Sequence, residues 1–366
     1  MNKAFKYRLC PTQEQQEMFA KTFGCVRFIY NKMLSDKIEY YKETKQKLNN
    51  TPAQYKKEFE WLNEVDSLAL ANAQMNLQSA YNNFFRNTKV GFPKFKSKKH
   101  KKNIYTTNNQ NGTISIIGNH IKLPKVGNVK IVYHRIIPDD YKIKSAAITR
   151  TRSDKYFVSV LVECDNDKSF EYTGKNVGID LGLKYFIITS EGLKISNPKY
   201  FVKSQNKLAK LQRELSRKTR GSSNYNKAKF KLAKQCEHIA NQRNDFLQKL
   251  STQLVKDYDI ICTENLNVEG LLKNHSLTKS ISDVSWSMFI SMLTYKCDWY
   301  SKRLVKINRF YPSSKLCHSC GYKNNNLTLA DRYWTCPECR TNLDRDINAA
   351  MNILNEGLRN IKSNTI

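Results

Sequence analysis

The stretch Val177-Gly-Ile-Asp-Leu-Gly182, followed by Leu183-Lys-Tyr-Phe-Ile-Ile-Thr189, predicts two short apolar strands joined by a turn. Asp180 is expected where the first strand ends. The flanking residues Gly178 and Gly182 allow a bulky group to approach the backbone closely. An aspartate in such a place can be a metal ligand, part of a phosphate site or only a turn former. Acids at comparable places elsewhere in the chain favour the metal-ligand interpretation.

Two further acids stand at comparable places. Glu264 ends an apolar strand expected at residues 259–264, and Asp346 lies in the first turn of a helix expected within residues 343–353. Successive acids are 84 and 82 residues apart, so they can meet only through the fold. Together Asp180, Glu264 and Asp346 suit two Mg²⁺ or Mn²⁺ ions that bridge the carboxylates and a scissile phosphate. One ion would activate a water and the other would stabilise the leaving 3′ oxygen.

Four of the ten cysteines form a second cluster, Cys317-His-Ser-Cys320 and Cys336-Pro-Glu-Cys339, with the spacing C-x2-C-x15-C-x2-C. This spacing predicts a Zn²⁺ ion held by four thiolates, and the ion would be structural because the protein fills every ligand position. A redox pair is the alternative, but it does not explain two matched knuckles. His318 is interpreted as a bystander. The other six cysteines are scattered singly, which is typical of reduced core residues.

The charge of the chain indicates a polyanionic partner. Its 366 residues include 62 Lys and Arg against 32 Asp and Glu, a net charge of +30. No apolar run reaches the roughly 18 residues that a membrane span requires, and the first residues lack a signal peptide. Nucleic acid is therefore favoured over a membrane. Residues 199–256 carry 15 basic and three acidic side chains, and residues 94–102 contain six lysines. The second segment is either a solvated loop or a phosphate contact.

Periodicity predicts the remaining elements. A strand over residues 1–10 precedes a helix with a capping box at Thr12 and Gln15 and a break at Gly24. A second helical region is expected over residues 55–87, with its aromatic stripe in the core. The period of two over residues 113–171 predicts a small antiparallel barrel or sheet, and we expect a helix pair turning near residues 221–223.

These motifs resemble the transposon-encoded TnpB family, ancestors of the type V CRISPR effector nucleases. The resemblance covers essentially the whole chain, in order. It rests on the segments VGIDLGLKYF, TENL, CHSC with CPEC, DRDINAAMNI, KYRLCPTQEQ, VGFPKFKSKK and FYPSSKLCHSCG. It implies a fold with α/β, all-β and all-α parts. These parts are an N-terminal β-barrel wedge domain (residues 1–10 plus 90–172), a helical recognition domain (11–89), an RNase H-like RuvC nuclease domain (173–312 plus 341–366) and a zinc-ribbon insert (313–340).

The resemblance also implies a function, an RNA-guided, Mg²⁺-dependent DNA endonuclease encoded by a transposable element. The family's catalytic acids carry over to Asp180, Glu264 and Asp346, with Asp344 as a neighbour. The implied partners are a guide RNA from the transposon end and double-stranded target DNA beside a short flanking motif. Residues around Ser67, Leu68 and Ala71, and the segment 110–111, would face that motif. A monomer in a prokaryotic cytoplasm, associated with the nucleoid and with no membrane partner, is expected.

Three rival interpretations use the same residues. A transposase would join DNA ends with the same acids and without RNA. A non-catalytic regulator would bind nucleic acid through the basic helices and the zinc ribbon. Residues 178–182 also resemble the phosphate loop of sugar-kinase and chaperone ATPases. Those proteins need further glycine-rich loops, and this chain has only 13 glycines and no convincing second loop.

Overall fold

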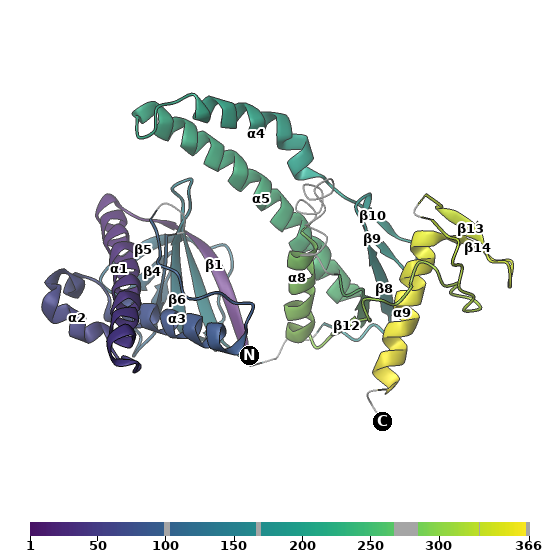
Figure 1. Ribbon diagram of the computed structural model, residues 1–366, viewed down its shortest axis with the longest axis horizontal. Helices are drawn as coiled ribbons and strands as arrows, with labels where there is room; N and C mark the ends of the chain where they lie inside the picture. The colour runs from purple at the N-terminus through teal and green to yellow at the C-terminus, as the bar shows by residue number, and fades with distance from the viewer. Residues whose placement is uncertain (99–102, 166–169, 267–284, 329, 364–366) are drawn as a thin grey trace. The chain divides into compact units, whose positions relative to one another are not determined.

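The computed structural model describes residues 1–98, 103–165, 170–266, 285–328 and 330–363 (Figure 1). The chain divides into two compact units, Met1–Asp165 and Asn166–Ile366. Among the described helices, none combines the length and the apolar character needed to cross a membrane.

The first unit is built on a seven-stranded antiparallel sheet. Its strand order is β2-β6-β7-β1-β5-β4-β3. The bounds are β1 (Asn2–Cys10), β2 (Asn103–Asn108), β3 (Ser115–Ile117), β4 (His120–Leu123), β5 (Gly127–Val132), β6 (Lys142–Arg150) and β7 (Tyr156–Glu163). Within the described residues the end strands β2 and β3 do not pair with each other. The expected barrel is therefore a curled half-barrel, in which the consecutive strands β6 and β7 pair as an antiparallel hairpin.

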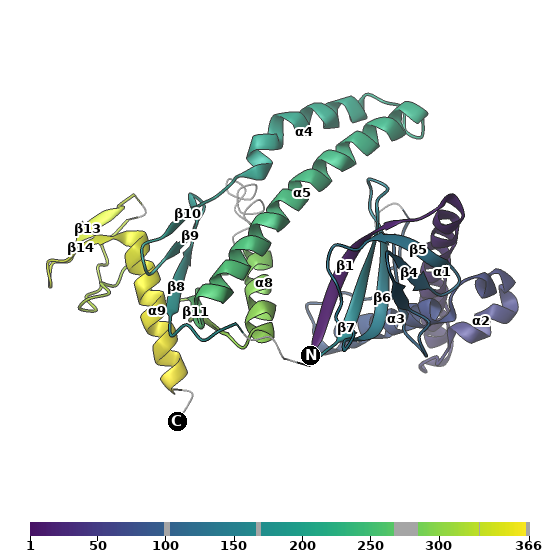
Figure 2. The ribbon, with the colours of Figure 1, turned by 180° about the vertical axis from the view of Figure 1, so that it is seen from behind.

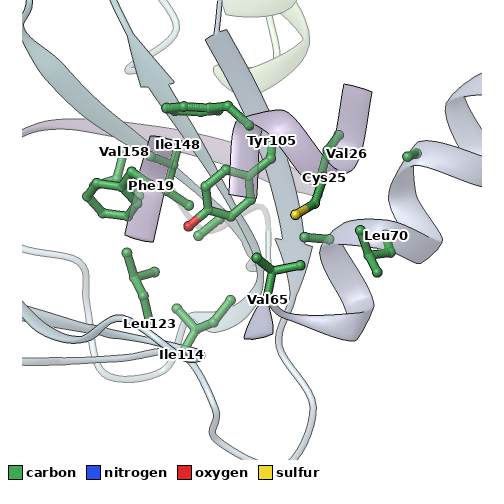
Figure 3. Close-up of a cluster of buried hydrophobic side chains, with 14 of the residues drawn as sticks. Phe19, Cys25, Val26, Val65, Leu70, Tyr105, Ile114, Leu123, Ile148 and Val158 are labelled. Carbon is green, nitrogen blue, oxygen red and sulfur yellow. The ribbon is translucent and has the colours of Figure 1, made fainter. Parts of the chain in front are cut away.

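Helices pack on this sheet to form its core. They are α1 (Gln13–Thr44), α2 (Pro52–Glu58), the 3-10 helix η1 (Glu60–Glu64) and α3 (Ser67–Arg86). The capping box is confirmed, because Gln15 N–H donates to Thr12 Oγ1 at 3.4 Å and Thr12 N–H donates to Gln15 Oε1 at 3.1 Å. Figure 3 shows Phe19, Cys25 and Val26 of α1 in one apolar cluster with Tyr105 and other core side chains.

One expectation for these helices is wrong, and another is confirmed with breaks that the sequence did not show. Helix α1 continues through Gly24, because buried Phe23, Cys25 and Val26 anchor it on both sides and offset the roughly 1 kcal/mol cost of a helical glycine. The second helical region is divided into α2, η1 and α3. Asp66 caps α3 by accepting a hydrogen bond from Leu68 N–H at 3.2 Å, and Thr107 Oγ1 also donates to its carboxylate. A buried polar contact from the sheet thus sets where α3 begins.

The second unit contains a mixed five-stranded sheet with the order β10-β9-β8-β11-β12. The strands are β8 (Asn176–Leu181), β9 (Tyr185–Thr189), β10 (Lys194–Ser196), β11 (Ile260–Thr263) and β12 (Arg303–Lys306). Strand β11 runs parallel to both β8 and β12, while β9 is antiparallel to β8 and β10. The predicted helix pair is confirmed as α4 (Tyr200–Ser216) and α5 (Ser223–Asp257).

Helices cover both faces of this sheet. Val177 and Ile179 of β8 lie in one apolar cluster with residues of α5 and of α8 (Trp286–Trp299). The alternate residue Gly178 faces helix α9 (Arg345–Ser363). Figure 2 shows the sheet between α8 and α9, with the two-stranded sheet of β13 (Tyr333–Thr335) and β14 (Asn342–Asp344) beside α9.

Two glycines let α9 lie directly on the strands. A Cβ atom on Gly178 would overlap the carbonyl oxygen of Ala350 and lie 2.7 Å from the amide nitrogen of Leu354. A Cβ atom on Gly357 would overlap Cys262 Sγ of β11. Neither position has room for a side chain, so the backbones of α9, β8 and β11 are held in close contact.

Substituting these glycines tests that contact. We expect Gly178→Ala to lower the free energy of unfolding by about 3 kcal/mol or more, because backbone atoms of α9 must move away. Gly24→Ala is the matched control: its Cβ meets no atom within 4 Å, so it should stabilise α1 by about 0.5–1 kcal/mol. Thermal and denaturant unfolding followed by circular dichroism measures both. Equal stability of Gly178→Ala and the unmodified chain would contradict the close packing.

Candidate functional site

Asp180 lies at the carboxyl end of β8, on the face that α9 covers. Its strand pairs in parallel with β11, and the register matches Ile179 with Thr263. Glu264 therefore follows β11 at the level of Asp180, since the carboxyl ends of parallel strands share one edge of a sheet. The sequence placed both acids at strand ends, and the strand pairing makes them neighbours.

The pKa of Asp180 shows that the three predicted acids interact. Burial raises the pKa of Asp180 most, the charges of Glu264 and Asp346 raise it further, and the resulting value is about 7. The positive charge of Arg345 and the hydrogen bond from the Leu181 backbone N–H lower this pKa but do not offset the increase. An aspartate normally ionises near pH 3.9. The charges of Glu264 and Asp346 thus make it harder for Asp180 to carry its own charge. Among the described residues, the four cysteines are the group whose ligand atoms lie close enough together to hold one metal ion, and the three acids do not form such a group.

Arginines surround Asp346 in the first turn of α9. Its Oδ2 lies 3.3 Å from Nη1 of Arg332, and its Oδ1 lies 3.3 Å from Nη2 of Arg345. Arg332 belongs to the segment between the two cysteine pairs and is half exposed. Nothing in the sequence spacing singled out Arg332, because it meets Asp346 only through the packing of β13 beside α9.

Asp344 has a different role from its neighbour Asp346. Its Oδ1 accepts hydrogen bonds from the backbone N–H groups of Asp346 at 3.0 Å and Ile347 at 3.2 Å, so it caps α9. Lys194 of β10 pairs with its other oxygen at 2.5 Å. Burial works against ionisation, but Lys194 and these N–H donors hold the pKa of Asp344 below its usual range.

Buried asparagines of α9 position the loop that precedes the first cysteine pair. Asn352 donates to the carbonyls of Ser313 at 2.8 Å and Leu316 at 2.7 Å. Asn348 accepts from the backbone N–H of His318 at 2.9 Å. Ser313 in turn donates from Oγ to Glu264 Oε1 at 2.6 Å. The sequence analysis did not single out these three polar residues, although two asparagines four residues apart on an amphipathic helix are a usable signal.

The four predicted cysteines converge at one point. Their Sγ atoms all lie within 4.8 Å of one another, with 3.6 Å between Cys317 and Cys339 and 3.5 Å between Cys320 and Cys336. A disulfide would be near 2.0 Å, whereas a tetrahedral zinc–thiolate site has sulfurs about 3.8 Å apart. These sulfurs therefore fit a zinc-ribbon-type site. His318 is not part of it, since its ring Nδ1 lies 3.0 Å from Asn348 Oδ1.

The two cysteine knuckles have matching backbones. Positive φ angles follow the second cysteine of each pair, at Gly321 (+79°) and Arg340 (+56°). In each knuckle that residue donates its N–H to the carbonyl of the first cysteine at 2.9 Å, Gly321 to Cys317 and Arg340 to Cys336. A small apolar core of Trp334 and Leu343 supports both turns. The geometry is that of two equivalent turns that each present two sulfurs.

The predicted basic surfaces differ in how much of them the structure describes. On α4, α5 and the turn between them, all the basic side chains of residues 199–256 are exposed except Arg243. Of the lysine-rich stretch, residues 99–102 lie outside the described residues. Ser67, Leu68 and Ala71 lie at the start of α3, and residues 110–111 lie in the turn after β2.

Comparisons with known proteins agree with this architecture. The chain matches the family descriptions "Helix-turn-helix domain" over residues 1–46, "Probable transposase" over 159–275 and "Cas12f1-like, TNB domain" over 286–353. Residues 1–46 form one strand and one long helix here. A solved structure of a Cas12f1–sgRNA–target DNA complex matches with a TM-score of 0.59 at 13% identity, over 96% of this chain and 98% of that chain. This likeness is one of fold.

Relatives in sequence extend over nearly the full chain. A protein of Streptomyces pristinaespiralis named "Putative RNA-guided DNA endonuclease" is 38% identical over 98% of this chain and 90% of its own length. InsQ of Escherichia coli, which bears the same description, is 28% identical over 97% of this chain and 92% of its own. The fold and its cysteine cluster define a class of proteins with a curled half-barrel sheet and a unit of mixed helix and sheet. Within that class, this chain belongs to the TnpB family of transposon-encoded proteins.

The pKa of Asp180 makes a prediction about stability. Its folded value lies above the unfolded value, so the folded chain holds this proton longer and loses stability as pH rises from about 4 to about 7. Without added Mg²⁺, Asp180→Asn should therefore melt several degrees above the unmodified protein at pH 8, and the gap should shrink at pH 5. Asp344→Asn is a control with the opposite sign, because the pKa of Asp344 is lowered in the folded chain. This variant should melt at a lower temperature than the unmodified protein at pH 8. A pH-independent gap for Asp180→Asn would contradict the raised pKa.

Proposed function

We propose that this protein is an RNA-guided, Mg²⁺-dependent DNA endonuclease encoded by a transposable element. The supporting observation is the placement of three acids: Asp180 and Glu264 follow the adjacent parallel strands β8 and β11 at one edge of the sheet, and helix α9, which carries Asp346 in its first turn, packs on β8. The charges of Glu264 and Asp346 also help raise the pKa of Asp180 to about 7. Carboxylates gathered at this cost are typical of sites that bind a divalent cation. The names of the full-length relatives supply the guide RNA and the DNA substrate.

In this proposal the second unit is an RNase H-like RuvC nuclease domain. Residues 173–312 plus 341–366 would form it, with residues 313–340 as a zinc-ribbon insert. Its support is the mixed sheet with helices on both faces and the acids at the carboxyl ends of β8 and β11. Residues 1–10 plus 90–172 would be a wedge domain and residues 11–89 a recognition domain.

The three carboxylates are the groups that would hold Mg²⁺ or Mn²⁺. Two bound ions supply a water activated for in-line attack and positive charge at the leaving 3′ oxygen. The chain's own residues prepare the site: Ser313 orients Glu264 through its 2.6 Å hydrogen bond, and Asp344 fixes the start of α9. The half-exposed guanidinium of Arg332, 3.3 Å from Asp346, could reach a phosphate of the bound strand.

Nucleic acid would bind along the exposed basic side chains of α4 and α5. Guide RNA and target DNA both carry one charge per nucleotide, and neutralising them gives a salt-dependent affinity. Nearly every basic side chain of this helix pair is exposed, so they are free to follow a phosphate backbone. The protein would recognise the shape of the heteroduplex while base pairing reads its sequence.

A transposase that joins DNA ends is the second candidate. The "Probable transposase" match over residues 159–275 favours it, since that match includes Asp180 and Glu264. Both candidates use the same acids. They differ in their dependence on RNA and in their product, a cut in one case and a joined strand in the other.

Plasmid cleavage separates these candidates. The protein is purified from cells carrying its native locus, its bound RNA is sequenced, and a plasmid with the matching target is supplied with Mg²⁺. We expect cutting only with the RNA, and Asp180→Ala should reduce it at least about a hundredfold while RNA still binds. Asp140→Ala, which removes an exposed acid of the first unit, should cut normally.

Several results would count against the endonuclease. Unchanged cutting by Asp180→Ala would reject the assigned acids, and RNA-independent strand transfer would favour the transposase. A readout without catalysis is also available: Mg²⁺ should raise the melting temperature of the unmodified protein at pH 8 more than that of Asp180→Asn, because bound cations stabilise the ionised acids.

The cysteine cluster would hold a structural Zn²⁺ ion. Cys317→Ser should lower the zinc content of the purified protein sharply and destabilise the insert, because one of four thiolate ligands is lost. Reduced cutting should accompany it, since the loop from Ser313 to Cys320 also orients Glu264. Cys236→Ser removes an exposed single cysteine and is the control. Metal analysis that finds full zinc in Cys317→Ser would exclude the four-thiolate site.

A further inference from the structure

An exposed group of aromatic rings lies at the end of α3 and in the segment that follows. Phe84 is 5.1 Å from Phe85 and 5.4 Å from Phe92 between ring centroids, and Tyr81 is 5.6 Å from Phe92. The exposed fractions are 70% for Phe85 and 43% for Phe92. We call these four residues the aromatic shelf. The sequence analysis assigned a stripe of Leu70, Leu77, Tyr81 and Phe84 to the core. Leu70 and Leu77 are buried, whereas Tyr81 and Phe84 are only half-buried.

The shelf is held in place before any ligand arrives. A turn joins Asn87 to Val90 through a backbone hydrogen bond of 2.9 Å, which returns the chain toward α3. Further along, Asn31 of α1 receives the Lys96 N–H at 2.7 Å and donates to the Lys96 carbonyl at 3.0 Å. Phe92 therefore sits between two anchored points. A surface ordered in advance loses little conformational entropy on binding.

The charged residues in the sequence around the aromatic shelf are all basic. From Ser67 to Lys98 the sequence contains five basic residues and no acidic one. Lys89 and Lys94 are exposed, and Lys47 Nζ lies 6.0 Å from the centre of the Phe85 ring. Unpaired nucleotides are bound by two kinds of side chain. Aromatic rings stack on the flat faces of the bases, and basic side chains contact the charged phosphates.

We propose that the aromatic shelf binds unpaired nucleotides of the guide RNA by stacking. The inference rests on the proposed function and names a contact for its RNA partner. Proteins that recognise unpaired RNA bases commonly stack them on aromatic side chains. Exposed aromatic clusters favour aggregation in a free protein. A guide RNA that stays bound would cover the shelf throughout, whereas target DNA arrives only for the reaction, so RNA is the favoured occupant.

Ring-specific substitutions test this contact. The probe is the RNA that copurifies with the unmodified protein, labelled and titrated against each purified variant after RNA removal. Phe85→Ala with Phe92→Ala should weaken binding about tenfold or more. Replacing both residues with tyrosine (Phe85→Tyr with Phe92→Tyr) keeps the rings and should leave binding normal. Replacing both with leucine (Phe85→Leu with Phe92→Leu) keeps apolar side chains without rings and should weaken binding as much as the double alanine variant. Ile117→Ala, 71% exposed on β3 of the same unit, is the matched control and should have no effect.

Other occupants of the shelf would give distinct results. Normal RNA binding by the double leucine variant would show that rings are not needed and would overturn stacking. Weaker binding of single-stranded DNA of the same sequence with unchanged RNA binding would assign the shelf to DNA instead. Unchanged RNA affinity with cutting still lost in Asp180→Ala would reject this inference alone, whereas absence of any copurifying RNA would reject the proposed function.

Discussion

The second unit depends on the direct contact of α9 with β8 and β11. Gly178 and Gly357 remove two side chains at the points where helix and strands touch, and the backbone of α9 fills the space. Because α9 starts with Asp346, this packing sets the distance between that acid and Asp180. A helix displaced by the width of one methyl group would separate the carboxylates, and protein interiors rarely absorb such a change without loss of stability.

The negative charges of Asp180, Glu264 and Asp346 repel one another, and basic side chains nearby reduce that repulsion. Arg345 and Arg332 form ion pairs with Asp346, and Lys194 forms an ion pair with Asp344. Asp180 has no such ion pair among the described residues, and its pKa is the one raised to about 7. The electrostatic repulsion therefore acts on the Asp180 carboxylate at the end of β8. A bound cation would offset this repulsion and favour the ionised form of Asp180.

The acid cluster and the cysteine cluster are connected through α9. Asn348 and Asn352 hold the loop that carries Ser313 at one end and the first cysteine pair at the other. A change in the cysteine cluster would therefore move the same loop whose Ser313 hydrogen-bonds to Glu264. This connection gives the cysteine cluster an effect on the position of Glu264.

The sequence alone was enough to predict the cysteine cluster, most helices and the strands that end at Asp180 and Glu264. Those features follow from local patterns: cysteine spacing, apolar runs that end in an acid, and an acid in the first turn of an amphipathic helix. The continuity of α1 through Gly24, the open edges of the half-barrel and the exposed rings of the aromatic shelf followed only from tertiary structure. Each depends on what lies across the fold from a residue, such as the core under Cys25 or the turn that returns Phe92 to Phe84. Contacts such as Arg332 with Asp346 join residues whose separation in sequence carries no periodic signal, so only the packed chain could reveal them.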